Sequence, residues 1–152
     1  NGNGTVPTPN GQLHQLCPMC NGSGEDPGVE TFFQFVYDRA LTASEIRRQE
    51  RVVTDGDAAF IWKALTSTQQ STFRLRFQSG PGTYTSSSGT GGTNDFINNG
   101  NIAGTAEFPG PIIPHVKIPR SGVIVFDIEN LVAVGNTVQL VFHGAKWWPT
   151  PR

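Results

Sequence analysis

Residues 112–148 read IIPHVKIPRSGVIVFDIENLVAVGNTVQLVFHGAKWW, and this stretch decides the fold class. Apolar residues alternate with other residues in two runs, IVFDI at 124–128 and TVQLVF at 137–142. A period of two residues is typical of a strand with one buried face. Prolines and a Ser-Gly pair interrupt the chain before the first run, as they do at strand edges and in turns. The stretch therefore predicts two antiparallel β-strands.

The same alternation recurs upstream in the chain. It places Phe60 and Trp62 on one face of a strand at 58–65. In the cleanest run, 72–77, the aromatic and leucine side chains face inward, while Arg74 and Arg76 face water or a partner. A further run at 31–37 alternates Phe33, Phe35 and Tyr37 with other residues, and Phe33 is expected to belong to the core. With the turns between them, seven or eight strands predict an all-β protein, an antiparallel β-sandwich or jelly roll with very little helix.

One segment, LTASEIRRQERVV at 41–53, is ambiguous. Thr42 followed three residues later by Glu45 is a capping-box pattern, and its Glu, Arg and Gln residues favour helix. Its apolar residues Ile46, Val52 and Val53, however, do not form a helical stripe. An extended chain is the favoured interpretation.

Residues 1–29 are predicted to form an extended tail, and residues 30–152 one jelly-roll domain. The tail is rich in Gly, Asn and Pro and has almost no apolar side chains to bury. Ordering such a segment costs roughly 1–2 kcal/mol per residue in backbone entropy, so we expect it to be held by a partner if it is ordered. The stretch 79–104 is likewise poor in apolar residues and long for a loop, which favours a functional or flexible role.

Composition limits the classes of partner. The chain has 152 residues and a formal net charge of -1, so electrostatics gives no reason to expect binding to nucleic acid or membranes. Charged residues make up 15%, well below the ~25% usual for soluble domains. A neutral polar surface loses little on desolvation and suits a protein that packs against copies of itself.

The sharpest local motif is Cys17-Pro18-Met19-Cys20-Asn21-Gly22-Ser23-Gly24. It resembles one C-x-x-C-x-G-x-G repeat of the zinc fingers in DnaJ-type proteins. Tetrahedral zinc needs four ligands, of which Cys17 and Cys20 supply two and His14 a third. The fourth would come from a neighbouring subunit, a lost N-terminal segment, His115 or His143. A disulfide or two free thiols are the alternatives.

Few residues point to other chemistry. Asp55 and Asp57 flank a turn glycine, and no common nucleophile, zinc-protease or nucleotide-binding motif occurs, so we expect no enzyme. Trp147 and Trp148 close the last strand, so one of them should be buried. The other, with Arg74 and Arg76, is a candidate for a subunit interface, where Trp and Arg are enriched.

The order of strand and turn motifs along the sequence resembles that of small jelly-roll structural proteins of tailed bacteriophages. The resemblance spans about residues 31–148: F-x-F-x-x-x-x-x-L-T-A at 33–43, D-x-D-x-x-F at 55–60, the strand at 124–128, and V-Q-L-V-F-x-G-x-K-aromatic at 138–147. It implies a non-enzymatic protein located in the virion, which decorates or cements the capsid or serves a head or tail attachment. It also implies a homo-oligomer, a trimer or a pentamer, in contact with other virion proteins such as the major capsid protein. The alternatives are a secreted carbohydrate-binding β-sandwich module and a small zinc-binding adaptor.

Overall fold

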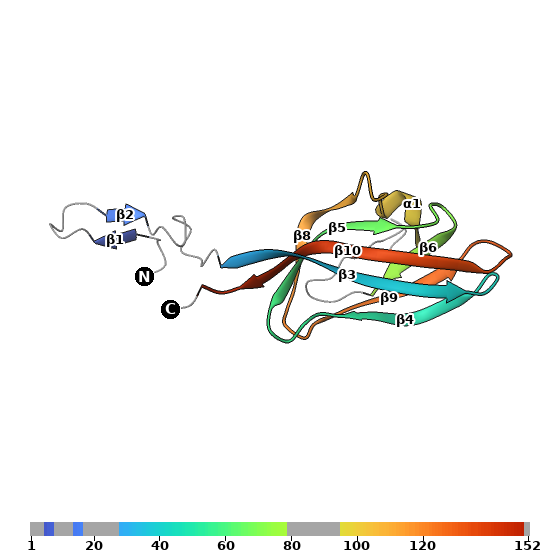
Figure 1. The fold of residues 1–152 in the computed structure, drawn as a ribbon, viewed down its shortest axis with the longest axis horizontal. Helices are drawn as coiled ribbons and strands as arrows, with labels where there is room; N and C mark the ends of the chain where they lie inside the picture. The colour runs from blue at the N-terminus through green and yellow to red at the C-terminus, as the bar shows by residue number, and fades with distance from the viewer. Residues whose placement is uncertain (1–4, 8–13, 17–27, 79–94, 151–152) are drawn as a thin grey trace. The chain divides into compact units, whose positions relative to one another are not determined.

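The structure is a computed structural model that describes residues 28–78 and 95–150 in full, and residues 5–7 and 14–16 by their backbone alone (Figure 1). The chain divides into two compact units. The first comprises Asn1–Thr31 and Trp147–Arg152, and in it β1 (Thr5–Pro7) pairs antiparallel with β2 (His14–Leu16). The second, Phe32–Lys146, holds the hydrophobic core.

Two four-stranded sheets form the sandwich. The first sheet has the order β3-β10-β5-β8, with β3 at Val29–Leu41, β10 at Asn136–Trp148, β5 at Ala59–Ser67 and β8 at Gly110–Ile118. The second sheet has the order β4-β9-β6-β7, with β4 at Ile46–Val53, β9 at Val123–Asn130, β6 at Phe73–Phe77 and β7 at Ile97–Asn98.

The strand order shows how the chain is wound. The pairs β3–β10, β4–β9, β5–β8 and β6–β7 are nested within one another and fall alternately in the first and the second sheet. This is the order of a long hairpin rolled onto itself, which is an eight-stranded jelly roll. The predicted all-β, antiparallel sandwich is confirmed. The one helix among the described residues, α1 at Asn99–Ile102, is a single turn, far too short and polar to cross a membrane.

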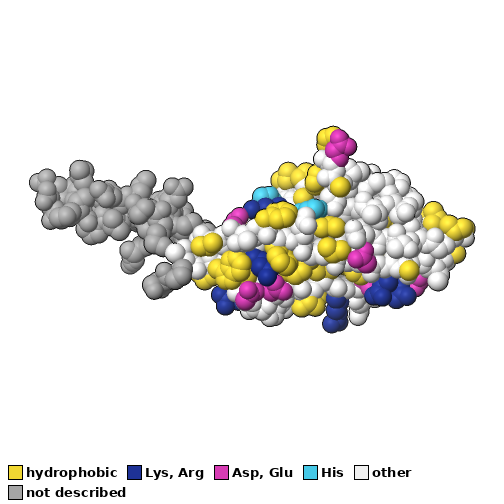
Figure 2. All heavy atoms as spheres, viewed as in Figure 1, with side chains coloured by type: hydrophobic (Ala, Val, Ile, Leu, Met, Phe, Trp, Pro, Cys, Tyr) yellow, Lys and Arg dark blue, Asp and Glu magenta, His cyan; other side chains and the backbone are white. Residues whose placement is uncertain are grey.

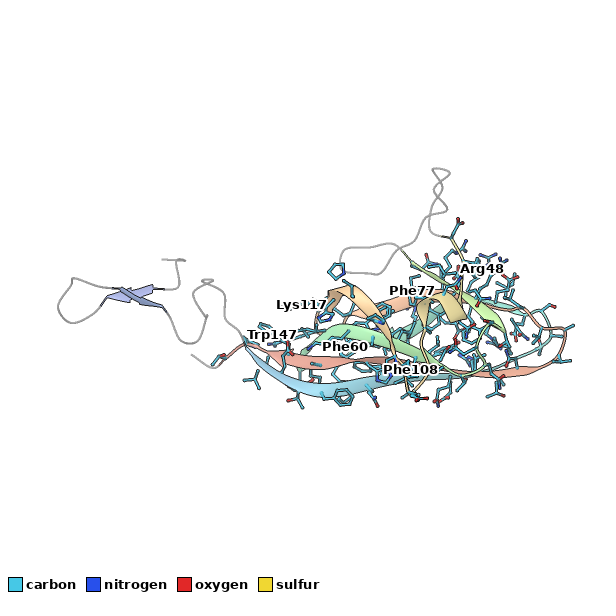
Figure 3. The ribbon with its side chains drawn as sticks, turned by 90° about the horizontal axis from the view of Figure 1, so that it is seen from above. Arg48, Phe60, Phe77, Phe108, Lys117 and Trp147 are labelled. Atoms are coloured by element: carbon cyan, nitrogen blue, oxygen red, sulfur yellow. The ribbon has the colours of Figure 1, made fainter. Side chains whose placement is uncertain are left out.

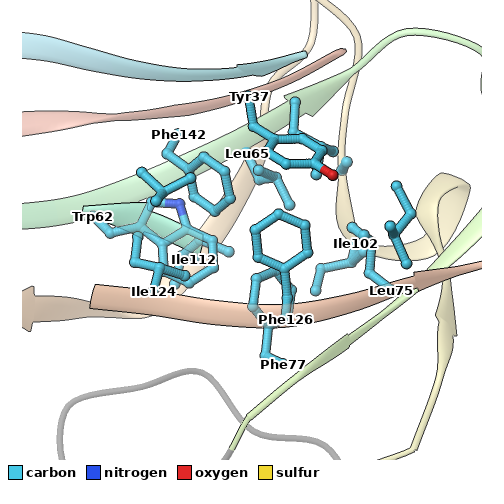
Figure 4. Packing of buried hydrophobic residues seen from close by; sticks show 14 of the residues in the cluster. Tyr37, Trp62, Leu65, Leu75, Phe77, Ile102, Ile112, Ile124, Phe126 and Phe142 are labelled. Atoms are coloured by element: carbon cyan, nitrogen blue, oxygen red, sulfur yellow. The ribbon is translucent and has the colours of Figure 1, made fainter. Parts of the chain in front are cut away.

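The core lies between the two sheets and is built from the predicted faces (Figure 4). Trp62 of β5 has its ring centre 5.3 Å from those of Phe77 and Phe142. Phe126 of β9 lies 5.0 Å from Tyr37, 5.8 Å from Phe77 and 6.0 Å from Phe142, measured between ring centres. The alternation therefore predicted the inward side chains of β5, β6, β9 and β10 correctly, because these side chains are fully buried.

The ambiguous segment is extended, as predicted, since β4 begins at Ile46. The capping-box residues before it still interact: the Thr42 N–H donates to the Glu45 carboxylate over 2.7 Å. The bond closes a turn between β3 and β4 instead of starting a helix, because the residues that follow pair with β9.

Two predictions about aromatic burial are wrong. Neither Trp147 nor Trp148 is buried: both are half-exposed, since they lie outside the unit that holds the core cluster. Trp147 lies near the end of β10 (Figure 3), beside Gly28, where a Cβ atom would overlap the indole ring. Phe33 is also only half-buried, because it packs edge-on against Phe35 at the rim of the core, with the Lys146 ammonium over its ring.

Candidate functional site

The predicted metal ligands are not placed by the structure. Cys17 and Cys20 lie outside the described residues, and His14 is in β2, where only the backbone is described. Within residues 28–78 and 95–150, no three His, Cys, Asp or Glu side chains gather as possible metal ligands. The zinc site stays a prediction.

Arg74 and Arg76, the predicted interface arginines, lie on the outer face of the second sheet. The register of β6 with β9 places them opposite Glu129 and Asp127. Arg74 Nε donates to Glu129 Oε2 over 2.5 Å, and Arg76 donates to Asp127 Oδ2 over 3.0 Å from Nε and 2.5 Å from Nη2. These are cross-strand ion pairs on one face of the sheet.

Asp127 is the centre of this network. Although it faces outward, it is only 1% exposed. Its Oδ1 accepts from the Gln49 N–H at 2.9 Å and from the Gln78 side-chain amide at 3.2 Å. The Gln49 N–H is available because β4 has a register shift between Arg47 and Glu50, and Gln49 has a positive φ of 56°. A β-bulge of this kind frees a backbone donor from the strand ladder.

Burial alone would raise the pKa of the Asp127 carboxyl. The Gln49 N–H, the Arg76 guanidinium and the Gln78 amide outweigh this effect and hold the pKa below its usual value. Arg74 and Arg76 also lie over the Phe96 ring, at 4.9 and 4.7 Å from its centre, as cation–π partners. Both arginines thus have partners within the chain, so they stabilise this face, and their interface role stays a prediction.

Acid should destabilise the sandwich through such carboxylates. The pKa of Glu50 is lowered as well: burial would raise it, but the Tyr37 O–H at 2.8 Å and Arg39 at 2.9 Å outweigh burial. Because the folded pKa values of Asp127 and Glu50 lie below the usual 3.8 and 4.5, their stabilisation is complete above those values. It is lost as the pH falls through the folded values.

We therefore expect the urea midpoint of unfolding to decrease as the pH is lowered from 5 to 2. In the Asp127→Asn variant, which has no carboxyl group to titrate at this position, the decrease should be smaller. Circular dichroism during urea titration at each pH measures it. A midpoint that stays constant or rises over this range would contradict the prediction.

A groove of about 400 Å³ lies on the outer face of the first sheet. Side chains of β3, β5 and β10, of the residue after β5 and of the loop before β8 line it: Gln34, Thr66, Ser67, Thr68, Ala106, Gln139, Val141 and His143. This size is within the range of small-ligand sites, roughly 300–1,000 Å³. Its volume and its lining make the groove a candidate site for a small ligand.

His143 is the central residue of the groove. Its Nδ1 lies 2.7 Å from the Gln34 amide nitrogen and its Nε2 lies 2.9 Å from the Thr66 hydroxyl oxygen. Burial lowers the pKa of the imidazole below its usual value, so the ring is neutral at pH 7. His143 lies on the outward side of β10, next to the buried Phe142. His115, in contrast, is exposed on β8.

The sequence did not identify Gln34, Thr66 or Gln139 as site residues. Each is an ordinary polar residue on the outer face of a strand, and no local motif marks it. Only the pairing of β10 with both β3 and β5 brings them together.

Comparison of the chain with protein-family models, with curated proteins and with solved structures gave no match.

Proposed function

We propose that the chain is a non-enzymatic structural protein of a phage virion, which decorates or cements the capsid, or serves a head or tail attachment, by self-association. The sequence resemblance at residues 31–148 supports the virion assignment. The jelly roll is compatible with it, since viral capsid domains and lectins both use this fold. Self-association is inferred from how well each sheet edge is protected against pairing with another chain.

Three of the four sheet edges are protected against pairing with another chain. Edge strand β8 contains Pro111 and Pro114, and its register with β5 shifts between Trp62 and Ala64. Edge strand β4 is rich in arginine and bulged, and β7 has only two residues. Prolines, charges, bulges and short length are the usual ways to block edge pairing.

Edge strand β3 is less protected over residues 31–37, which contain no proline and no charged residue. Phe32 and Val36 are 70% and 53% exposed there. Figure 2 shows that hydrophobic side chains gather over β3 and β10 on the same face. A long edge strand with exposed apolar side chains is a template for association with another chain. A closed trimer or pentamer requires this edge to meet a different surface of the next copy.

Phe32→Asp should weaken self-association at least tenfold, because it introduces a charge into the proposed contact. The matched control is Val53→Asp, since Val53 is 58% exposed on the edge strand β4 of the other sheet. Sedimentation velocity across a concentration series gives the oligomer number and its dissociation constant. A monomeric wild-type chain at high concentration, or equal effects of the two variants, would contradict the proposal.

The virion assignment has its own test. We expect genes for portal and major capsid proteins beside the gene for this chain, and the chain in purified particles by mass spectrometry. Neighbouring genes for secreted polysaccharide-degrading enzymes would instead favour the carbohydrate-binding module.

A further inference from the structure

The groove on the first sheet has the chemistry of a site for an uncharged ligand. Among the described residues, its lining contains amides, hydroxyls, one imidazole and two small apolar side chains, and no Asp, Glu, Lys or Arg. The His143 imidazole is neutral at pH 7, since burial lowers its pKa. The groove therefore offers no ion pair to an anion or a cation, and it is too polar for a purely apolar ligand.

The hydrogen bonds of His143 determine which hydrogen-bonding groups of Gln34 and Thr66 remain available to a ligand. A neutral imidazole has one donor and one acceptor nitrogen. Because the Gln34 amide nitrogen donates to Nδ1, Nε2 carries the proton and donates to the Thr66 oxygen. This leaves the Thr66 hydroxyl proton as a donor and the Gln34 side-chain oxygen as an acceptor, with the His143 ring between the two residues.

A second pair of polar residues repeats this arrangement. The Gln139 N–H donates to Thr68 Oγ1 over 2.9 Å, and the Thr68 N–H donates to the Gln139 carbonyl over 3.1 Å. The Gln139 side-chain nitrogen is held by Asp38 at 2.8 Å. The Thr68 hydroxyl proton and the Gln139 side-chain oxygen are thus left beside Val141. Groups fixed in this way need little ordering when a ligand binds.

We propose that this groove binds one or two sugar units of an uncharged glycan. Sugar hydroxyls donate and accept at once, which matches donor–acceptor pairs spaced along a sheet, and the C–H faces of a sugar ring fit Val141 and Ala106. A peptide fits less well, because the groove lies over the outer face of the sheet, whereas main-chain pairing of a peptide takes place along a strand edge. The lining also lacks a deep apolar pocket for a side-chain anchor.

The groove is complete within one copy of the chain, so the proposal does not rest on self-association. Sugar binding that survives in the Phe32→Asp monomer would separate the two proposals. In a virion protein, such a groove would serve attachment to a neutral surface glycan.

The test uses the whole 152-residue chain on an array of neutral oligosaccharides built from glucose, galactose, mannose and N-acetylglucosamine, with sialylated and sulfated oligosaccharides as charged probes. The strongest neutral probe is then titrated by calorimetry and by NMR of the His143 ring. We expect binding of neutral probes alone and a shift of the His143 signals. Gln34→Ala and Thr66→Val should each weaken binding about tenfold.

Thr137→Val is the matched control, because Thr137 is exposed on β10 and does not line the groove. It should bind like the wild type. Gln34 is exposed, so Gln34→Ala decides the question if Thr66→Val does not fold. No binding to any neutral probe, a preference for the charged probes, or binding that Gln34→Ala leaves intact would overturn the proposal. Binding only of a peptide ligand would assign the groove to a protein partner instead.

Discussion

Phe126→Ala is expected to lower the free energy of unfolding by about 3–5 kcal/mol. Phe126 has no exposed surface and contacts aromatic rings on three other strands, Tyr37, Phe77 and Phe142. Its removal leaves a cavity between the two sheets, where rings from both sheets meet and cannot collapse without moving a strand. For a protein with about 5–15 kcal/mol of total stability, this is a large share.

Urea unfolding followed by tryptophan fluorescence measures the change, with the slope of the transition as a check for two-state behaviour. Phe108→Ala is the control, because the same ring is removed from a loop position that is 73% exposed (Figure 3). We expect it to change stability by less than about 0.5 kcal/mol. Similar losses for the two variants would show that Phe126 does not lie at the centre of the core.

Asp127→Ala is expected to cost about 3 kcal/mol. The substitution removes the acceptor of the Gln49 N–H, the Arg76 guanidinium and the Gln78 amide together. The loss leaves a half-buried arginine without its carboxylate and a backbone donor of the β4 bulge without an acceptor. The cost of unsatisfied partners, more than the lost attraction, sets this magnitude.

Glu129→Ala provides a matched control on the same strand. Glu129 pairs with Arg74, whose side chain is 43% exposed, so water screens and replaces the interaction. We expect a loss below about 1 kcal/mol from the same urea titration. If both variants lose the same stability, the bulge and the burial of Asp127 do not strengthen its interactions.

A third variant, Arg76→Ala, separates a role of the arginines in stabilising the sheet from a role in a subunit interface. If Arg74 and Arg76 serve mainly the sheet, Arg76→Ala should resemble Asp127→Ala in stability and leave the oligomeric state unchanged. If Arg76→Ala instead dissociates an oligomer, the interface role predicted from the sequence is supported.

The sequence alone determined the buried faces of β5, β6, β9 and β10. The alternation at 72–77, 124–128 and 137–142 places inward the side chains that are buried in β6, β9 and β10. This works because the side-chain period of a strand is a local property of the backbone. The class of fold follows, since many such strands with turns between them close into a sandwich.

Other outcomes needed the tertiary structure. Asp127 alternates as an outward residue, yet a bulge in β4 and an arginine of β6 enclose it. Trp147 and Trp148 alternate like a continued strand, yet both are half-exposed. The groove joins Gln34, Thr66 and His143 from strands far apart in the chain. The reason is the same in each case: alternation states which way a side chain points, whereas its environment depends on distant strands that fold against it.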